Sequence, residues 1–165
     1  MSLLLGAATL CGCTARGQTP DFELDPPTDF SLNFLVRGSS GAVDPVERTS
    51  RYLVEANGNL RAVHGRAAPG LTYPPLVRRL NPADMEKLMK FVHGHKLMAE
   101  PSSPGAESTE AARTVFELEI MSWNQAHRYL TTPEESPPTL QLLTRLIRLL
   151  NPATPPDATE PEPSS

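Results

Sequence analysis

Residues 116–121 read FELEIM, and this stretch decides the fold. Phe116, Leu118 and Ile120 recur at every second position, which is the period of a β-strand. Such a strand turns one face to a hydrophobic core and leaves the other face in water. The alternate positions Glu117 and Glu119 indicate which face is wet, so the stretch predicts a sheet that is covered on one side.

Four more patterned stretches extend this sheet. Residues 51–56 and 60–64 flank Asn57-Gly58, a pair that favours the left-handed backbone of a type I′ hairpin turn. Residues 127–132 follow the FELEIM strand after a short turn and complete a second hairpin. Residues 30–36 alternate in the same way and predict one further strand.

Two helices are predicted from their boundary residues. Asn81 suits an N-cap, Pro82 suits the first helical position, and Gly94 suits the end of that helix. A second helix is predicted from Ser136 to Asn151, where leucines recur at helical spacing.

The order of these elements predicts one α+β domain over residues 29–151. It has the order β-ββ-α-ββ-α, with about five antiparallel strands in two hairpin groups. Both helices are expected on one face of the sheet. A length of 165 residues is consistent with a single domain.

The N-terminal residues 1–12 form an uncharged apolar run that is too short to span a bilayer as a helix. The run ends in Leu10-Cys11-Gly12-Cys13, which resembles the lipobox of bacterial lipoproteins. That resemblance implies that residues 1–12 are a signal peptide removed after Gly12. It further implies that Cys13 carries fatty acyl chains such as palmitate, so that a membrane of the cell envelope holds the protein.

One feature departs from the lipoprotein pattern, because no Lys or Arg precedes the apolar run. Either the chain starts too late, or the Met1 amino group alone supplies the positive charge. The alternative interpretation of residues 1–12 is a buried apolar strand or helix. The chain has two cysteines, Cys11 and Cys13, so cleavage and acylation leave no thiol in the domain.

Three segments have compositions that do not favour packed structure. Residues 13–28 are predicted to be a tether between the lipid and the domain. Residues 100–112 are predicted to be a mobile loop inside the domain. Residues 152–165, which are rich in proline and acidic side chains, are predicted to be a disordered tail.

The sequence offers no recognisable catalytic, cofactor or metal motif, so a non-enzymatic protein is expected. His93-Gly94-His95 is read as a helix end rather than a zinc site, because the nearby carboxylates Glu86 and Glu100 do not complete an HExxH or similar ligand spacing. Glu117 and Glu119 are read as solvation and edge protection of their strand. A formal net charge of −4 argues against nucleic acid as a partner.

Four residues are candidates for contact with a protein partner. Tyr73, Arg78 and Arg79 are placed on a loop before the first helix, and Trp123 is placed in the second hairpin turn. Tyr, Trp and Arg are the residue types enriched at binding hot spots. For Tyr73 and Trp123 the alternative is packing against the core.

The element order over residues 30–150 also resembles that of emfourin-type metalloprotease inhibitors. The features that carry this resemblance are a strand running into Gly38-Ser39-Ser40-Gly41, a helix opening at residues 80–83, the FELEIM strand and the closing leucine-rich helix. The expected function is that of a lipid-anchored envelope lipoprotein that binds a partner or has a structural role. The resemblance implies the alternative, inhibition of a secreted metalloprotease.

Overall fold

A computed structural model describes residues 26–98 and 113–151. The predicted signal peptide, Cys13, most of the tether, the 100–112 loop and the tail after residue 151 lie outside these residues. The described chain forms eight helices and strands in the following order: β1 Ser31–Arg37, β2 Ser50–Val54, β3 Asn59–His64, β4 Leu76–Arg79, α1 Pro82–Gly94, β5 Val115–Ser122, β6 Gln125–Thr131 and α3 Pro137–Leu150.

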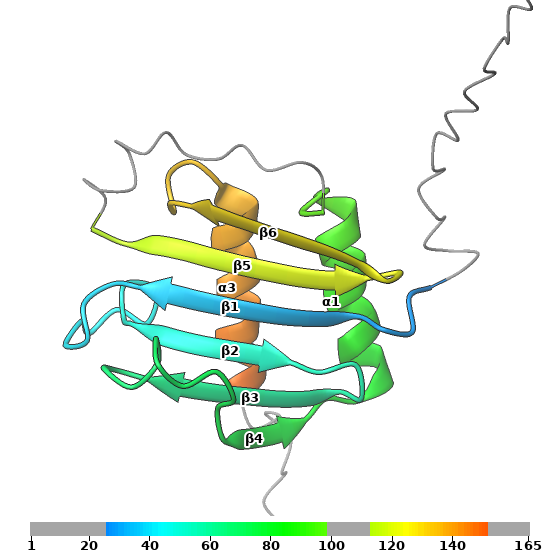
Figure 1. Cartoon of the computed structure of the whole chain (residues 1–165), viewed down its shortest axis with the longest axis horizontal. Coiled ribbons are helices and arrows are strands. Elements are labelled where there is room, and N and C mark those ends of the chain that lie inside the picture. Colours follow the sequence, from blue (N-terminus) through cyan, green and yellow to red (C-terminus); the bar gives the residue numbers. More distant parts are fainter. Residues whose placement is uncertain (1–25, 99–112, 152–165) are drawn as a thin grey trace, which may run out of the picture.

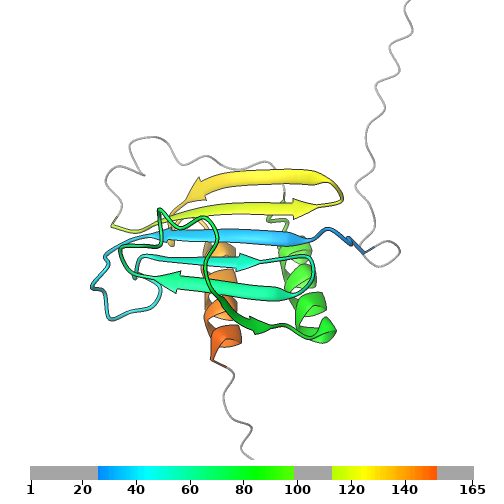
Figure 2. The same cartoon turned by 60° about the horizontal axis from the view of Figure 1, so that its bottom comes forward.

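The strands form one antiparallel sheet in the order β4-β3-β2-β1-β5-β6 (Figure 1). Both helices lie behind this sheet and leave its other side open, which Figure 2 shows from a second direction. The α+β class, the antiparallel pairing and the two helices are therefore as predicted. We call the side away from the helices the open face.

The alternation that predicted the strands also builds the core. Phe116, Leu118 and Ile120 of β5 are buried beneath the helices, as are Leu32 and Phe34 of β1. The helices contribute the remaining large buried side chains, among them Leu88, Phe91, Leu142, Leu143 and Leu146. Burial of this apolar surface is the main favourable term in folding, at about 25 cal/mol per Å².

The sheet has six strands rather than the predicted five, because residues 76–79 form β4. The sequence interpretation placed Arg78 and Arg79 on a loop, and that placement is wrong. Leu60 pairs with Arg78 and Asn59 with Arg79, across a register shift in β3. The strand has only four residues, directly follows Pro74-Pro75 and shows no apolar alternation, so it gave no periodic signal.

The two hairpins are confirmed, but the β2–β3 turn differs from the prediction. At the β2–β3 turn only Gly58 has a positive φ, of 84°, so Asn57-Gly58 is not a type I′ pair. At the β5–β6 turn Trp123 and Asn124 both have positive φ, of 49° and 58°. The carboxylate of Asp29 accepts hydrogen bonds from both backbone N–H groups, at 2.8 and 2.5 Å. A residue distant in sequence therefore holds a turn that contains no glycine.

The helix boundaries agree with their sequence signals. The Asn81 side chain accepts a hydrogen bond from the Asp84 backbone N–H at 2.8 Å, and Pro82 begins α1. α1 ends at Gly94 and α3 ends at Leu150. Within the described residues, neither helix is long and apolar enough to cross a membrane.

Candidate functional site

The structure does not bring the four predicted contact residues together. Tyr73 precedes β4, and Arg78 and Arg79 belong to β4, at one edge of the sheet. Trp123 lies in the turn between β5 and β6, the two strands at the opposite edge. The four residues therefore do not form one surface, and each is considered separately.

Trp123 packs against the end of α1. Its ring centroid lies 4.6 Å from that of His93, and the side chain is half-buried. The Nε2 atom of His93 lies 3.4 Å from the Oγ atom of Ser122, but Ser122 is fully buried and faces the core. Burial lowers the pKa of His93, because it disfavours the charged form of the ring. This serine–histidine contact joins β5 to α1.

Arg78 has a structural role in the described fold. Its Nη1 atom donates to the backbone oxygen of Leu149 at 2.9 Å, and its Nη2 atom lies 3.5 Å from the carboxylate of Asp84. The side chain thus joins β4 to the start of α1 and to the end of α3. Arg79, the next residue, is exposed and lines a groove of about 720 Å³ beside the start of α1.

Tyr73 belongs to a polar cluster next to β4. The Arg61 guanidinium lies 4.0 Å from the centroid of the Tyr73 ring and donates to Glu55 at 2.8 Å. The pKa of Glu55 is lowered to about 2, and the largest cause is the hydrogen bond that the Tyr73 hydroxyl donates to the Glu55 carboxylate. Burial, the second-largest effect, opposes this lowering, and bonds from Asn59 and Arg61 add smaller contributions that lower the pKa further. The cluster fixes one face of Tyr73 and leaves more than half of its surface exposed.

Four large apolar side chains lie exposed between residues 71 and 77. They are Leu71, Tyr73, Leu76 and Val77, with exposed fractions of 39%, 58%, 53% and 47%. We call these four residues the β4 edge surface. β4 is the last strand of the sheet and pairs only with β3, so its outer side leaves backbone N–H and C=O groups unpaired within the sheet. An edge strand with exposed apolar side chains is a surface on which another protein segment can pair.

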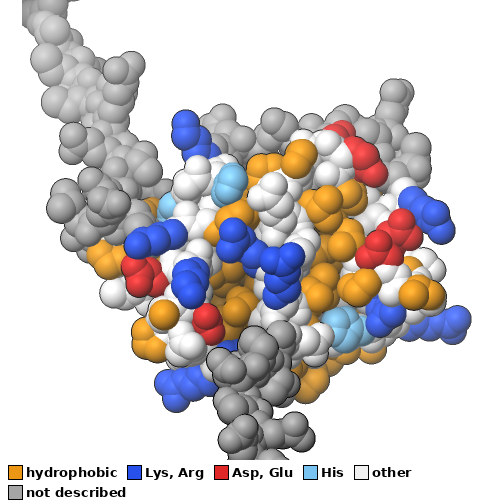
Figure 3. Space-filling model, turned by 180° about the vertical axis from the view of Figure 1, so that it is seen from behind, with side chains coloured by type: hydrophobic (Ala, Val, Ile, Leu, Met, Phe, Trp, Pro, Cys, Tyr) orange, Lys and Arg blue, Asp and Glu red, His pale blue; other side chains and the backbone are white. Residues whose placement is uncertain are grey.

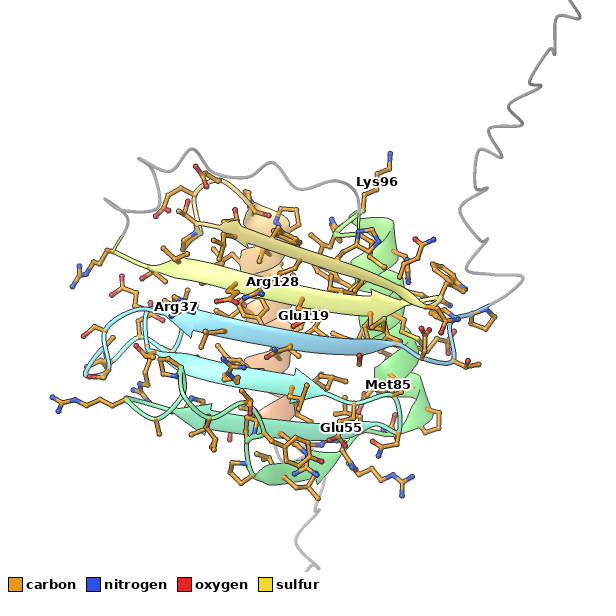
Figure 4. All side chains as sticks on the ribbon, viewed as in Figure 1. Arg37, Glu55, Met85, Lys96, Glu119 and Arg128 are labelled. Atoms are coloured by element: carbon orange, nitrogen blue, oxygen red, sulfur yellow. The ribbon has the colours of Figure 1, made fainter. Side chains whose placement is uncertain are left out.

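On the middle of the open face, polar side chains pair with each other. Glu117 forms ion pairs with Arg37, at 2.8 Å, and with Arg128. Burial raises the pKa of Glu117, but the two arginines outweigh that effect, and the pKa is lowered overall. Figure 4 shows Arg128 and Glu119 over the same part of the sheet. Because β5 lies between β1 and β6, the prediction that Glu117 and Glu119 protect a sheet edge is wrong.

Sequence reasoning missed Arg51, which holds the chain between β3 and β4 against the open face. This arginine is only 8% exposed. Its Nε and Nη2 atoms donate to the backbone oxygens of Ala68 and Pro69, at 3.1 and 3.3 Å. Residues 65–75, which we call the covering loop, include Leu71 and Tyr73 of the β4 edge surface and lead directly into β4. An arginine in an alternating strand gives no sign in the sequence that it points beneath a loop.

Replacing Arg51 with alanine should release the covering loop. Loss of two hydrogen bonds from a charged group costs about 1.5–3 kcal/mol, which raises the population of the open loop roughly tenfold or more. The measurement is the rate of trypsin cleavage after Arg66, an exposed residue of this loop, under native conditions. Arg37→Ala removes an arginine from the same face and should leave that rate unchanged. An unchanged rate in Arg51→Ala would contradict the role given to Arg51.

No group of three or more His, Cys, Asp or Glu side chains that could hold a metal ion occurs within residues 26–98 and 113–151. No protein-family model matches this chain, and no curated protein matches it in sequence. The function is therefore inferred from the fold and from the geometry of its surfaces.

Proposed function

We propose that this chain is a lipid-anchored protein of the cell envelope that binds a protein partner and catalyses no reaction. The lipobox-like sequence ending at Cys13 supports the anchor. The β4 edge surface is the observation that supports partner binding. The mutual pairing of Glu117 with Arg37 and Arg128 supports a structural rather than a chemical use of the open face.

The two edges of the sheet differ in a way that favours β4 as the contact. Two of the four residues of β4, Leu76 and Val77, are exposed large apolar side chains. β6, at the other edge, has one such residue among seven, Leu130. Soluble proteins usually protect an edge strand with charges or by covering it. An extended segment of a partner could pair with β4 through backbone hydrogen bonds and bury these side chains.

Capture of partners from envelope extracts tests this function. We expect Leu76→Lys/Val77→Lys to lose a partner that the wild-type chain retains, because two charges would have to be buried on pairing. Leu130→Lys, which adds a charge at the other edge, should retain it. A partner that all three chains capture equally would contradict binding at β4. If the partner is a secreted metalloprotease whose activity falls on binding, the result supports the inhibitor function over a purely structural role.

A further inference from the structure

The charges of this chain are divided between its described fold and the segments outside it. All but one of the 15 Lys and Arg residues lie within residues 26–98 and 113–151. Nine of the 19 Asp and Glu residues lie outside these ranges. The described fold is therefore basic, although the whole chain is acidic. The overall net charge, which argued against nucleic acid as a partner, does not describe the charge of the fold itself.

Part of this basic charge lies in a groove between the two helices. The interhelical groove has a volume of about 180 Å³, and its lining residues are Asp84, Lys87, Leu88, Arg145, Arg148 and Leu149. Figure 3 shows Lys and Arg side chains gathered in the middle of the helix-covered side, with fewer Asp and Glu side chains near them. The groove is therefore a surface where several cations approach one another.

The cations of the groove have no carboxylate partner among the described residues. Asp84, the only acidic residue of the groove, forms its ion pair with Arg78. The neighbouring Glu86 pairs with Lys90 at 2.8 Å. The Arg145 guanidinium lies 4.4 Å from the centroid of the Phe91 ring. This cation–π contact does not neutralise the positive charge of Arg145. Lys87, Arg145 and Arg148 are all exposed, so an anion can reach them.

The C-terminal tail begins beside this groove. α3 ends at Leu150, one residue after the groove residue Leu149, whose backbone oxygen is bonded to Arg78. Residues 152–165 contain three acidic side chains, Asp157, Glu160 and Glu162, and no Lys or Arg. Six residues of extended chain from Asn151 reach about 20 Å. Arg145 lies about 9 Å back along the helix axis, so all three carboxylates are within reach of the groove.

We propose that the interhelical groove is an anion-binding site and that the acidic tail of the same chain occupies it. The tail is held by charge-assisted contacts from Lys87, Arg145 and Arg148 to its carboxylates. A short linker gives the tail a local concentration in the millimolar range, so that weak contacts suffice for occupancy. The tail therefore competes with any other anion for the groove. This inference is independent of the β4 edge surface and of the lipid anchor.

The experiment compares the full chain with two variants of equal charge change. Asp157→Asn/Glu160→Gln/Glu162→Gln neutralises the tail, and Asp21→Asn/Glu23→Gln/Asp25→Asn neutralises the same number of acidic residues before β1. At low salt, the NMR signals of Lys87, Arg145 and Arg148 should shift in the tail variant and stay in place in the control. In the wild-type chain, about 0.5 M salt should produce the same shifts, because exposed ion pairs are screened.

Titration with inorganic pyrophosphate provides a second measurement. The tail variant should bind pyrophosphate about two- to tenfold more tightly than the wild-type chain, since a competing group has been removed. The control variant should bind like the wild type. Unmoved groove signals, equal shifts in both variants, or equal pyrophosphate affinity in wild type and tail variant would each overturn the proposal. All substitutions lie outside the described fold, so a folding defect does not obscure the result.

Discussion

Phe116→Ala should lower the free energy of unfolding by about 3–5 kcal/mol, the range for removal of a buried aromatic side chain. Phe116 is fully buried on β5 and its ring lies edge-on to that of Phe34, with 5.3 Å between the centroids. β5 is paired on both sides, with β1 and with β6, so the cavity would lie inside the core and not at a free edge of the sheet. Since small domains are stable by only about 5–15 kcal/mol, this loss should lower the melting temperature by about 10–20 °C.

Urea unfolding followed by circular dichroism measures this effect. Met121→Ala changes the same strand on the open face, where the side chain is 38% exposed, and should cost less than about 1 kcal/mol. Phe116→Leu should lie between the two and remain measurable if Phe116→Ala does not fold. Similar losses for Phe116→Ala and Met121→Ala would mean that the two faces of the sheet are not as assigned.

The part of the fold that could be predicted is the part that local chemistry determines. Strand β5 follows from the alternation of Phe116, Leu118 and Ile120, and helix α1 follows from the cap at Asn81. Strand β4 could not be found in this way, because pairing with β3 rather than any periodicity makes it a strand. The β5–β6 turn depends on Asp29, a contact across more than 90 residues that no local pattern indicates.

The candidate surfaces were predicted less completely than the fold. The sequence suggested Tyr73 from its residue type, and the structure places it among exposed apolar side chains. It also suggested Arg78, whose contacts with Leu149 and Asp84 show a role in holding elements together. Residue type alone cannot separate these cases, because exposure depends on what packs from elsewhere in the chain. The division of charge between fold and tail, in contrast, needed only the boundaries of the fold.

Cys13→Ala should abolish incorporation of a labelled fatty acid into the protein when the chain is expressed in bacterial cells. The proposed diacyl group attaches through the Cys13 sulfur, which alanine lacks. Two or more acyl chains give stable membrane anchoring, whereas a single chain gives only marginal binding. The measurement is label recovered after immunoprecipitation, together with the mass of the mature N-terminus, which should begin at Cys13 in the wild-type chain.

Cys11→Ala is the matched control for this experiment, because it removes the other cysteine of the chain, two residues earlier. It should keep full label, since position 11 lies in the segment that the proposed cleavage after Gly12 would remove. Membrane fractionation alone would not decide the question, because an uncleaved apolar segment could hold the Cys13→Ala chain at the membrane without lipid. Incorporation of the labelled fatty acid therefore distinguishes a lipid anchor from membrane attachment by an uncleaved segment. Equal label in Cys13→Ala and wild type, or a mature chain that begins elsewhere, would rule out Cys13 as the anchor.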